Sequence, residues 1–149
     1  MTVTVASTLG NDILRLDHTA IVVGDLDAAI DGWVGLTGAH VTRRERVDTQ
    51  RVEIAMLDVG GTALELITPT DSESGVARFL TKRGESLHHV AFEVRDISTA
   101  LERLEAAGFA LIDLTPRPGA HGLVAFIHPR STRGVLVELI QVTDAAAHS

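Results

Sequence analysis

The stretch His18-Thr19-Ala20-Ile21-Val22-Val23-Gly24-Asp25-Leu26 indicates how this chain folds. Its pattern returns 71 positions later as His89-Val90-Ala91-Phe92-Glu93-Val94-Arg95-Asp96-Ile97, and the likeness continues into the residues that follow. A repeat of this kind predicts two copies of one supersecondary unit. It also places two histidines at equivalent positions.

The two copies end alike as well. Ala63-Leu64-Glu65-Leu66-Ile67 corresponds to Leu136-Val137-Glu138-Leu139-Ile140, so each copy has a carboxylate inside an apolar run. A glutamate in such a run is costly to bury unless something compensates its charge. Neutral imidazoles and carboxylates together suit a divalent cation. The sequence therefore predicts a metal site made of His18, Glu65, His89 and Glu138.

For any one of these side chains, a structural role is the simpler interpretation. A lone histidine is more often a satisfied core residue than a ligand, and a strand glutamate is often exposed at a sheet edge. One duplication placed all four at equivalent positions, and this favours the metal site. Because neighbouring residues of a strand point to opposite sides, His88 is expected to face away from His89. The alignment of the two copies pairs His18 with His89, so His89 is the predicted ligand.

Composition and charge narrow the class of protein. With 149 residues, 45% of them hydrophobic, the chain fits one domain that folds without a partner. The lack of cysteine excludes disulfides and thiolate ligands. A net charge of −7 argues against a nucleic-acid partner. No apolar run predicts a membrane helix or a signal peptide, so we expect a cytoplasmic protein without a membrane partner.

We expect an α+β fold, with two tandem βαβββ modules forming a curled mixed sheet around a metal-binding cleft. The modules cover residues 14–68 and 87–141, joined by a linker at 69–86, and together form one domain, 14–141. Residues 1–13 and 142–149 have no clear hydrophobic period and are predicted as loose tails.

In the first module, a strand through Ala20 to Val23 ends at Asp25, a predicted helix N-cap. Apolar residues with helical spacing follow, and Gly38 can end the helix in a left-handed conformation. The second module repeats this pattern with Asp96 as cap and Gly108 as stop. The remaining strands are predicted at 40–46, 51–58, 62–68, 109–114, 122–128 and 134–140, and a short linker helix at 76–80.

Three further stretches carry a family resemblance: Leu87-His88-His89-Val90-Ala91-Phe92, Pro116-Arg117-Pro118-Gly119-Ala120-His121-Gly122, and Ile127-His128-Pro129-Arg130-Ser131. With the His and Glu positions, they make the chain resemble the vicinal oxygen chelate superfamily, and within it the methylmalonyl-CoA epimerases. The resemblance extends from about Leu16 to Gln141. The chain departs from the epimerase pattern at Gly32-Trp33, at Gln50-Arg51 and at Gly75.

The resemblance implies metal-dependent epimerisation of (R)- and (S)-methylmalonyl-CoA, in which a proton leaves and returns at C2 through an enolate. It implies an acyl-CoA substrate, a homodimer and a divalent metal ion, with Co²⁺ preferred and Mn²⁺, Ni²⁺ or Zn²⁺ as alternatives. It also suggests Glu53 and Glu138 as bases, with Glu138 doubling as a ligand. On this interpretation, Glu53→Gln retains metal and loses most turnover.

Other activities fit parts of the same pattern. Glyoxalase I uses a similar four-ligand set and also moves a proton through an enediolate, and a related acyl-CoA epimerase differs only in its acyl group. An extradiol dioxygenase needs two histidines and one glutamate, which leaves Glu65 without a role. A small-molecule-binding protein of this superfamily usually lacks part of the ligand set, and all four ligands are present here.

Overall fold

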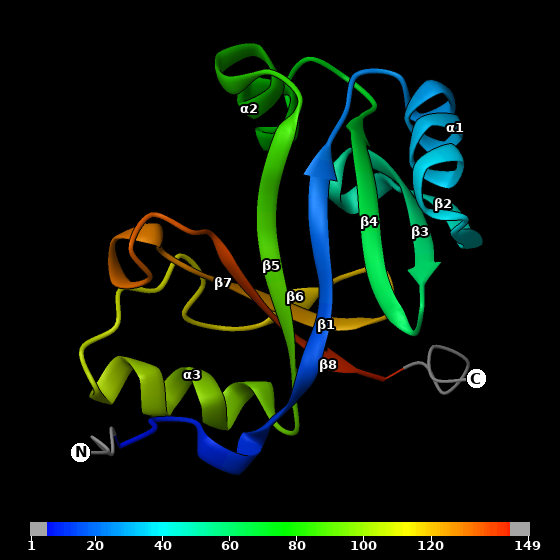
Figure 1. Cartoon of the computed structure of the whole chain (residues 1–149). Coiled ribbons are helices and arrows are strands. Elements are labelled where there is room, and N and C mark those ends of the chain that lie inside the picture. The colour runs from blue at the N-terminus through cyan, green and yellow to red at the C-terminus, as the bar shows by residue number, and fades with distance from the viewer. Residues whose placement is uncertain (1–5, 144–149) are drawn as a thin grey trace. The chain divides into compact units, whose positions relative to one another are not determined.

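A computed structural model describes residues 6–143 of the chain (Figure 1). These residues belong to two compact units, which we describe separately: unit 2 is Asp17–Ala91, and unit 1 comprises the residues before and after it. Of the predicted tails, residues 1–5 and 144–149 lie outside the described residues.

Unit 2 contains a mixed β-sheet. Its strands lie in the order β2 (His40–Val47), β3 (Val52–Val59), β4 (Thr62–Pro69), β1 (Ile13–Val22), followed by β5 (Ser86–Val94). The β1 strand is parallel to β4, whereas β3 is antiparallel to β2 and β4. A short 3₁₀ turn, η2 (Asp48–Gln50), connects β2 to β3. The first residues of β1 and the last residues of β5 belong to unit 1.

One face of this sheet packs against α1 (Leu26–Thr37). The Asp25 side chain caps the helix by accepting a hydrogen bond from Ala28 N, and Gly38 ends it with a φ of +71°. Both residues act as the sequence predicts. The interface is an apolar cluster in which helix residues such as Leu26 and Trp33 meet Ala55, Leu57 and Leu66 of the sheet. We call this side of the sheet the α1 face.

The opposite face packs against α2 (Gly75–Arg83), the helix predicted in the linker. Ser74 caps α2 by accepting a hydrogen bond from Ala77 N at 3.0 Å. Val76, Phe79 and Leu80 of the helix pack against an apolar cluster of the sheet, made up of Val22, Val47, Val52, Ile54 and Ile67. We call this side the α2 face. Alternate residues of each strand therefore belong to different faces.

Unit 1 contains α3 (Ile97–Ala106) and an antiparallel sheet in the order β8 (Val137–Val142), β7 (Gly122–Ile127), β6 (Arg117–Pro118). Asp96 caps α3 by accepting a hydrogen bond from Thr99 N at 3.1 Å. The helix packs on β7 and β8 through an apolar cluster that includes Ile97, Leu101 and Leu139. A 3₁₀ turn, η3 (Pro129–Ser131), follows β7.

Two strand predictions in unit 1 need correction. Residues 109–114 form no strand, and only Leu111 makes an isolated bridge, to Ile127. Side chains provide some of the hydrogen bonds here: Asp113 Oδ2 accepts from Phe126 N, and Ser131 Oγ accepts from Ala110 N, each at 2.8 Å. Backbone bonds such as that from Ile112 N to Phe126 O at 2.9 Å remain beside them. Such side-chain acceptors compete with regular pairing. The short β6 forms later in the chain instead.

The last strand also begins later than predicted, at Val137 rather than at 134. Arg133 and Gly134 adopt positive φ angles of +57° and +94°, which belong to a turn and not to a strand. Near the N-terminus, residues predicted as loose tail form the 3₁₀ turn η1 (Gly10–Asp12). The Asp12 carbonyl accepts a hydrogen bond from Arg95 N at 2.9 Å, and this ties the segment to unit 1.

Each repeated half nevertheless has the predicted order of elements. The first half runs β1, α1, β2, β3, β4, and the second runs β5, α3, β6, β7, β8. The sheets contain both parallel and antiparallel pairs. These observations confirm an α+β fold made of two tandem βαβββ modules. Among the described residues, no helix has the length and hydropathy needed to cross a bilayer.

Candidate metal centre

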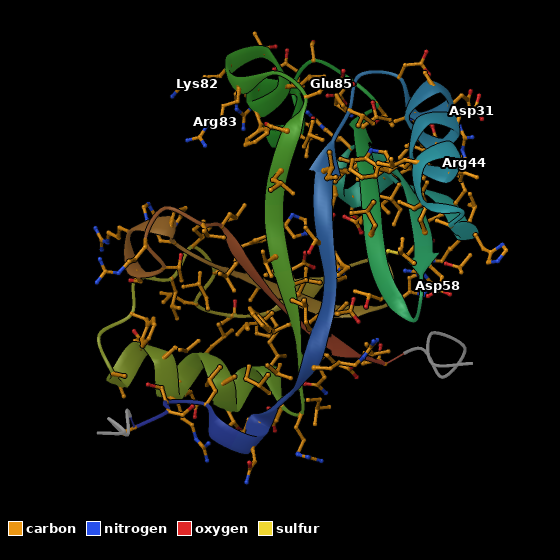
Figure 2. All side chains as sticks on the ribbon, viewed as in Figure 1. Asp31, Arg44, Asp58, Lys82, Arg83 and Glu85 are labelled. Carbon is orange, nitrogen blue, oxygen red and sulfur yellow. The ribbon has the colours of Figure 1, made fainter. Side chains whose placement is uncertain are left out.

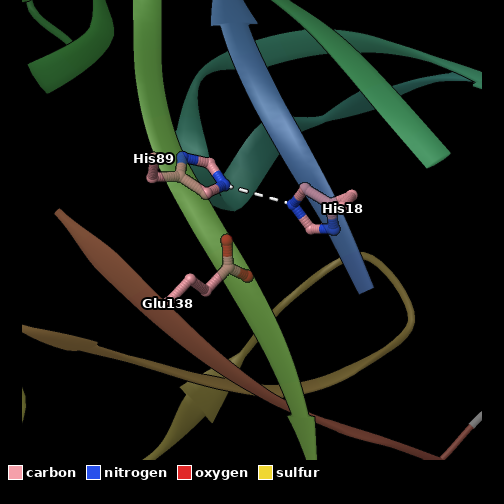
Figure 3. A group of neighbouring side chains, drawn as sticks. All are labelled: His18, His89 and Glu138. Carbon is pink, nitrogen blue, oxygen red and sulfur yellow. Dashed lines mark hydrogen bonds between the residues drawn. The ribbon is translucent and has the colours of Figure 1, made fainter. Parts of the chain in front are cut away.

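The two repeat-related histidines face each other in unit 2. His18 lies on β1 and His89 on β5, and their side chains are only 2% and 4% exposed. Their Nε2 atoms are 3.1 Å apart, and the dashed line in Figure 3 marks this contact. The rings meet edge to face, with centroids 5.3 Å apart. The structure thus brings together the two imidazoles that the repeat singled out.

Glu65 of β4 joins these histidines. The β1–β4 register pairs His18 with Ala63 and Ala20 with Glu65, so the side chains of His18 and Glu65 share one face of the sheet. The same register pairs Val22 with Ile67, which identifies this as the α2 face. Glu65 is 7% exposed, and its carboxylate oxygens lie 3.7 Å from His18 Nε2 and 3.9 Å from His89 Nε2.

The spacing of these donors suits a metal ion. Zinc-like ions bind imidazole nitrogen at about 2.0–2.1 Å, so two neighbouring nitrogen ligands at a right angle lie about 3 Å apart. The observed Nε2–Nε2 separation is 3.1 Å. Two imidazoles and one carboxylate form a donor set for borderline divalent ions. Burial of all three groups gives such an ion a site shielded from water.

Glu138, the fourth predicted ligand, belongs to β8 of unit 1, where its register partner is Phe126. It is 7% exposed and lies in an apolar strand, as the sequence predicts. Figure 3 labels His18, His89 and Glu138, three buried side chains of the types that hold metal ions.

Two residues that the sequence did not predict hold the outer nitrogens of the histidines. Asp17 Oδ2 lies 2.7 Å from His18 Nδ1, and His88 Nδ1 lies 2.8 Å from His89 Nδ1. The expectation that His88 faces away from His89 is therefore wrong: the two rings meet edge to face, with centroids 5.1 Å apart. The repeat contained the signal, because Asp17 and His88 occupy equivalent positions, each just before a histidine.

The structure places Glu53 away from these histidines. The β3–β4 register pairs Glu53 with Thr68 and Ala55 with Leu66, and Ala55 and Leu66 pack on the α1 face. Glu53 therefore shares the α1 face, whereas Glu65 lies on the α2 face. The neighbouring residue on the α2 face is Ile54, which is buried.

Arg44 of β2 holds Glu53 on that face. Its Nε donates a hydrogen bond to Glu53 Oε1 at 2.9 Å, and its Nη1 donates one to Asp27 Oδ1 at the start of α1. Figure 2 labels Arg44 beside α1. The hydrogen bond to Asp27, and then that to Glu53, raise the pKa of the Arg44 guanidinium above its usual value. The guanidinium therefore stays charged in any ordinary buffer. A charged partner of this kind competes for the lone pairs of the Glu53 carboxylate.

Comparison with known proteins identifies the class. Residues 17–128 match the family described as Glyoxalase/Bleomycin resistance protein/Dioxygenase superfamily. The chain belongs to this superfamily, and its two βαβββ modules agree with the vicinal oxygen chelate fold that the sequence indicated.

Within that class, the chain is similar to methylmalonyl-CoA epimerases. It is 38% identical over 131 residues to an ethylmalonyl-CoA/methylmalonyl-CoA epimerase of Cereibacter sphaeroides, covering 86% of this chain and 98% of that one. The crystal structure of methylmalonyl-CoA epimerase from Mycobacterium tuberculosis matches with a TM-score of 0.85 at 33% identity, over 98% and 97% of the chains. A Streptomyces coelicolor methylmalonyl-CoA epimerase variant in complex with 2-nitronate-propionyl-CoA has a TM-score of 0.81 at 33% identity, over 88% and 96%.

Proposed function

We propose that this protein is a metal-dependent isomerase that interconverts (R)- and (S)-methylmalonyl-CoA. The observation that carries the proposal is the convergence of His18, Glu65 and His89 at one buried point. The likeness to methylmalonyl-CoA epimerases over most of the chain supports the choice of substrate. An acyl-CoA with a different short branch, such as the ethyl group named for the Cereibacter sphaeroides relative, belongs to the same class of substrate.

The proposed metal ligands are His18, Glu65, His89 and Glu138, and Co²⁺ is the first candidate ion, followed by Mn²⁺, Ni²⁺ and Zn²⁺. The donor types support this set, because imidazole nitrogen and carboxylate oxygen serve all of these ions. When bound, a divalent cation acts as a Lewis acid that stabilises the negative charge on the thioester oxygen by several kcal/mol. An ion held by these four residues would also orient the substrate through its oxygens.

Proton transfer at C2 requires a base within hydrogen-bond reach. We propose Glu138, a buried carboxylate, for one transfer. Inversion also needs a proton to arrive at the opposite face of C2, and Glu53 is the candidate that the sequence offered for that step. Its position on the α1 face, bound to Arg44, argues against direct contact with substrate. The turnover of the variant Glu53→Gln tests whether Glu53 has this role.

The direct test begins with one pure epimer of methylmalonyl-CoA and follows the appearance of the other by chiral chromatography. The purified protein is assayed after loading with Co²⁺ and, in parallel, with the hemithioacetal of methylglyoxal and glutathione. We expect rapid epimerisation of the acyl-CoA and no conversion of the hemithioacetal. Conversion of the hemithioacetal alone contradicts the proposal and assigns glyoxalase I activity. A homodimer and a cytoplasmic location stay predictions.

A further inference from the structure

The positions just before the two histidines are equivalent in the repeat but carry different residues, Asp17 and His88. Each reaches the Nδ1 atom of its neighbour, at 2.7 Å for Asp17 and 2.8 Å for His88. We propose that Asp17 and His88 are positioning residues that turn the Nε2 atoms of His18 and His89 toward the metal. This proposal rests on the metal centre described above.

We infer the positions of the ring protons from these hydrogen bonds. A neutral imidazole carries one N–H, and an ionised carboxylate only accepts. Asp17 therefore holds the proton of His18 on Nδ1 and leaves His18 Nε2 as the unprotonated nitrogen. This is the form that binds a metal ion, so Asp17 presets His18. Carboxylates that hold the outer nitrogen of a ligating histidine act in this way in many metal sites.

His89 differs because its partner is another imidazole. The two Nε2 atoms are 3.1 Å apart. With the His18 proton on Nδ1, we infer that His18 Nε2 accepts and His89 Nε2 donates. His89 Nδ1 then accepts from His88 Nδ1–H at 2.8 Å. A metal ion needs the lone pair of His89 Nε2. Binding therefore requires the His89 proton on Nδ1, where it donates to His88 Nδ1, and the His88 proton moves to its own Nε2. Each ring keeps one proton throughout.

Contacts with α2 hold the His88 ring in position. It meets Phe79 of α2 edge to face, with ring centroids 4.7 Å apart. The Phe79 ring is covered in turn by the guanidinium of Arg83, at 5.6 Å. The His88 ring, packed against Phe79, can therefore change from hydrogen-bond donor to acceptor toward His89 Nδ1 without moving. His18 and His89 thus have unequal roles, one preset and the other adjusted on binding.

The first test reads the ring protons directly. Two-dimensional ¹⁵N–¹H NMR of the full chain distinguishes protonated from unprotonated imidazole nitrogens, without metal and with Zn²⁺ added. We expect His18 to carry its proton on Nδ1 in both states. His89 should change from Nε2–H to Nδ1–H on adding Zn²⁺, and His88 from Nδ1–H to Nε2–H. A His89 proton on Nδ1 in both states, or a His18 proton on Nε2 without metal, overturns the proposal.

The second test measures metal affinity. Asp17→Ala and His88→Phe each remove the hydrogen bond to the outer nitrogen of a histidine, and phenylalanine retains a ring that can pack on Phe79. Outer partners of this kind are worth about 10–100-fold in metal affinity. We expect Co²⁺ binding, measured by chelator competition, to weaken by that factor in both variants, and Asp17→Asn to recover part of the loss. The exposed residues Asp31 and His40 provide matched controls, Asp31→Asn and His40→Gln, that should bind as the wild type does.

Unfolding of the metal-free variants in urea separates positioning from general damage. Weaker binding with unchanged metal-free stability supports the proposal. Unchanged affinity in both variants, or a loss that only follows a loss of stability, overturns it. If the wild type binds no Co²⁺, the metal centre itself fails; if it binds and the variants do likewise, only the role of Asp17 and His88 fails.

Discussion

At the scale of single residues, the repeat predicted two histidines that the structure brings together. Which carboxylate lies beside them depends on the face of the strand that carries it. Glu53 and Glu65 lie on neighbouring strands, but the β3–β4 register pairs Glu65 with Met56 and Glu53 with Thr68. Positions 53 and 56 have opposite parity, so the two carboxylates point to opposite sides of the sheet. Sequence alone could not show which face each carboxylate occupies. That depends on which residues of β3 and β4 lie opposite each other in the folded sheet.

This placement gives a clear expectation for Glu53→Gln. Because Glu53 lies on the α1 face and is bound to Arg44, we expect turnover and metal content close to those of the wild type. Steady-state kinetics and elemental analysis provide the measurement, with the exposed Glu105→Gln as control. If turnover falls by most of its value while metal stays bound, Glu53 is a base after all and must leave Arg44 during catalysis.

Glu65→Ala should behave differently. Its carboxylate lies within 4 Å of both Nε2 atoms, and removal leaves a centre with one ligand fewer. We expect the purified variant to hold far less Co²⁺ than the wild type after gel filtration, as measured by elemental analysis, and to lose activity with it. Glu53→Ala serves as the comparison, because it removes a glutamate from the adjacent strand. Full metal occupancy in Glu65→Ala would remove Glu65 from the ligand set.

At the scale of elements, helix ends were predictable and strand ends were less so. Asp25, Gly38 and Asp96 act locally, through their own hydrogen bonds and dihedral angles. The strand predicted at 109–114 failed because Asp113 and Ser131 provide acceptors for backbone N–H groups. Ser131 is distant in sequence from Ala110, so no local pattern reveals that contact. The orientation of the His88 side chain was predicted wrongly. Alternation along a strand gives the direction in which a side chain leaves the backbone, and the imidazole ring can still turn back toward its neighbour.

The paired helix caps can be tested together. Asp25 and Asp96 hold the starts of α1 and α3 through equivalent hydrogen bonds at 3.0 and 3.1 Å. We expect Asp25→Ala and Asp96→Ala each to lower the free energy of unfolding by about 1 kcal/mol, measured by urea denaturation. Asp31→Ala in the exposed middle of α1 is the control. It should not lower the free energy of unfolding, because alanine favours helix. Equal stability of the cap variants and the wild type would show that the caps contribute little.

At the scale of the whole molecule, the compact units and the repeated modules divide the chain differently. The units separate within β1 and β5, whereas the repeat divides the chain between β4 and β5. The prediction that residues 14–141 form one domain implies that the chain unfolds in a single cooperative transition. Metal binding to the folded state alone must then stabilise the entire domain.

Metal addition provides a measure of that stabilisation. With free Co²⁺ at 100 times its dissociation constant, the free energy of unfolding should rise by about 2.7 kcal/mol. The shift should disappear when EDTA is added, and Glu65→Ala should show little of it. Urea unfolding, followed by circular dichroism in both conditions, gives the value. A wild type whose stability is the same with Co²⁺ and with EDTA would contradict the metal centre.

The most direct test of the central claim is solvent deuterium exchange at C2 of methylmalonyl-CoA, the carbon between the thioester and the carboxylate. The protein is incubated with the substrate in deuterium oxide, once loaded with Co²⁺ and once treated with EDTA, and deuterium at C2 is measured by mass spectrometry and NMR. We predict rapid incorporation with metal and almost none without it. No incorporation in either condition would contradict the epimerase assignment, and equal incorporation in both would contradict its dependence on metal.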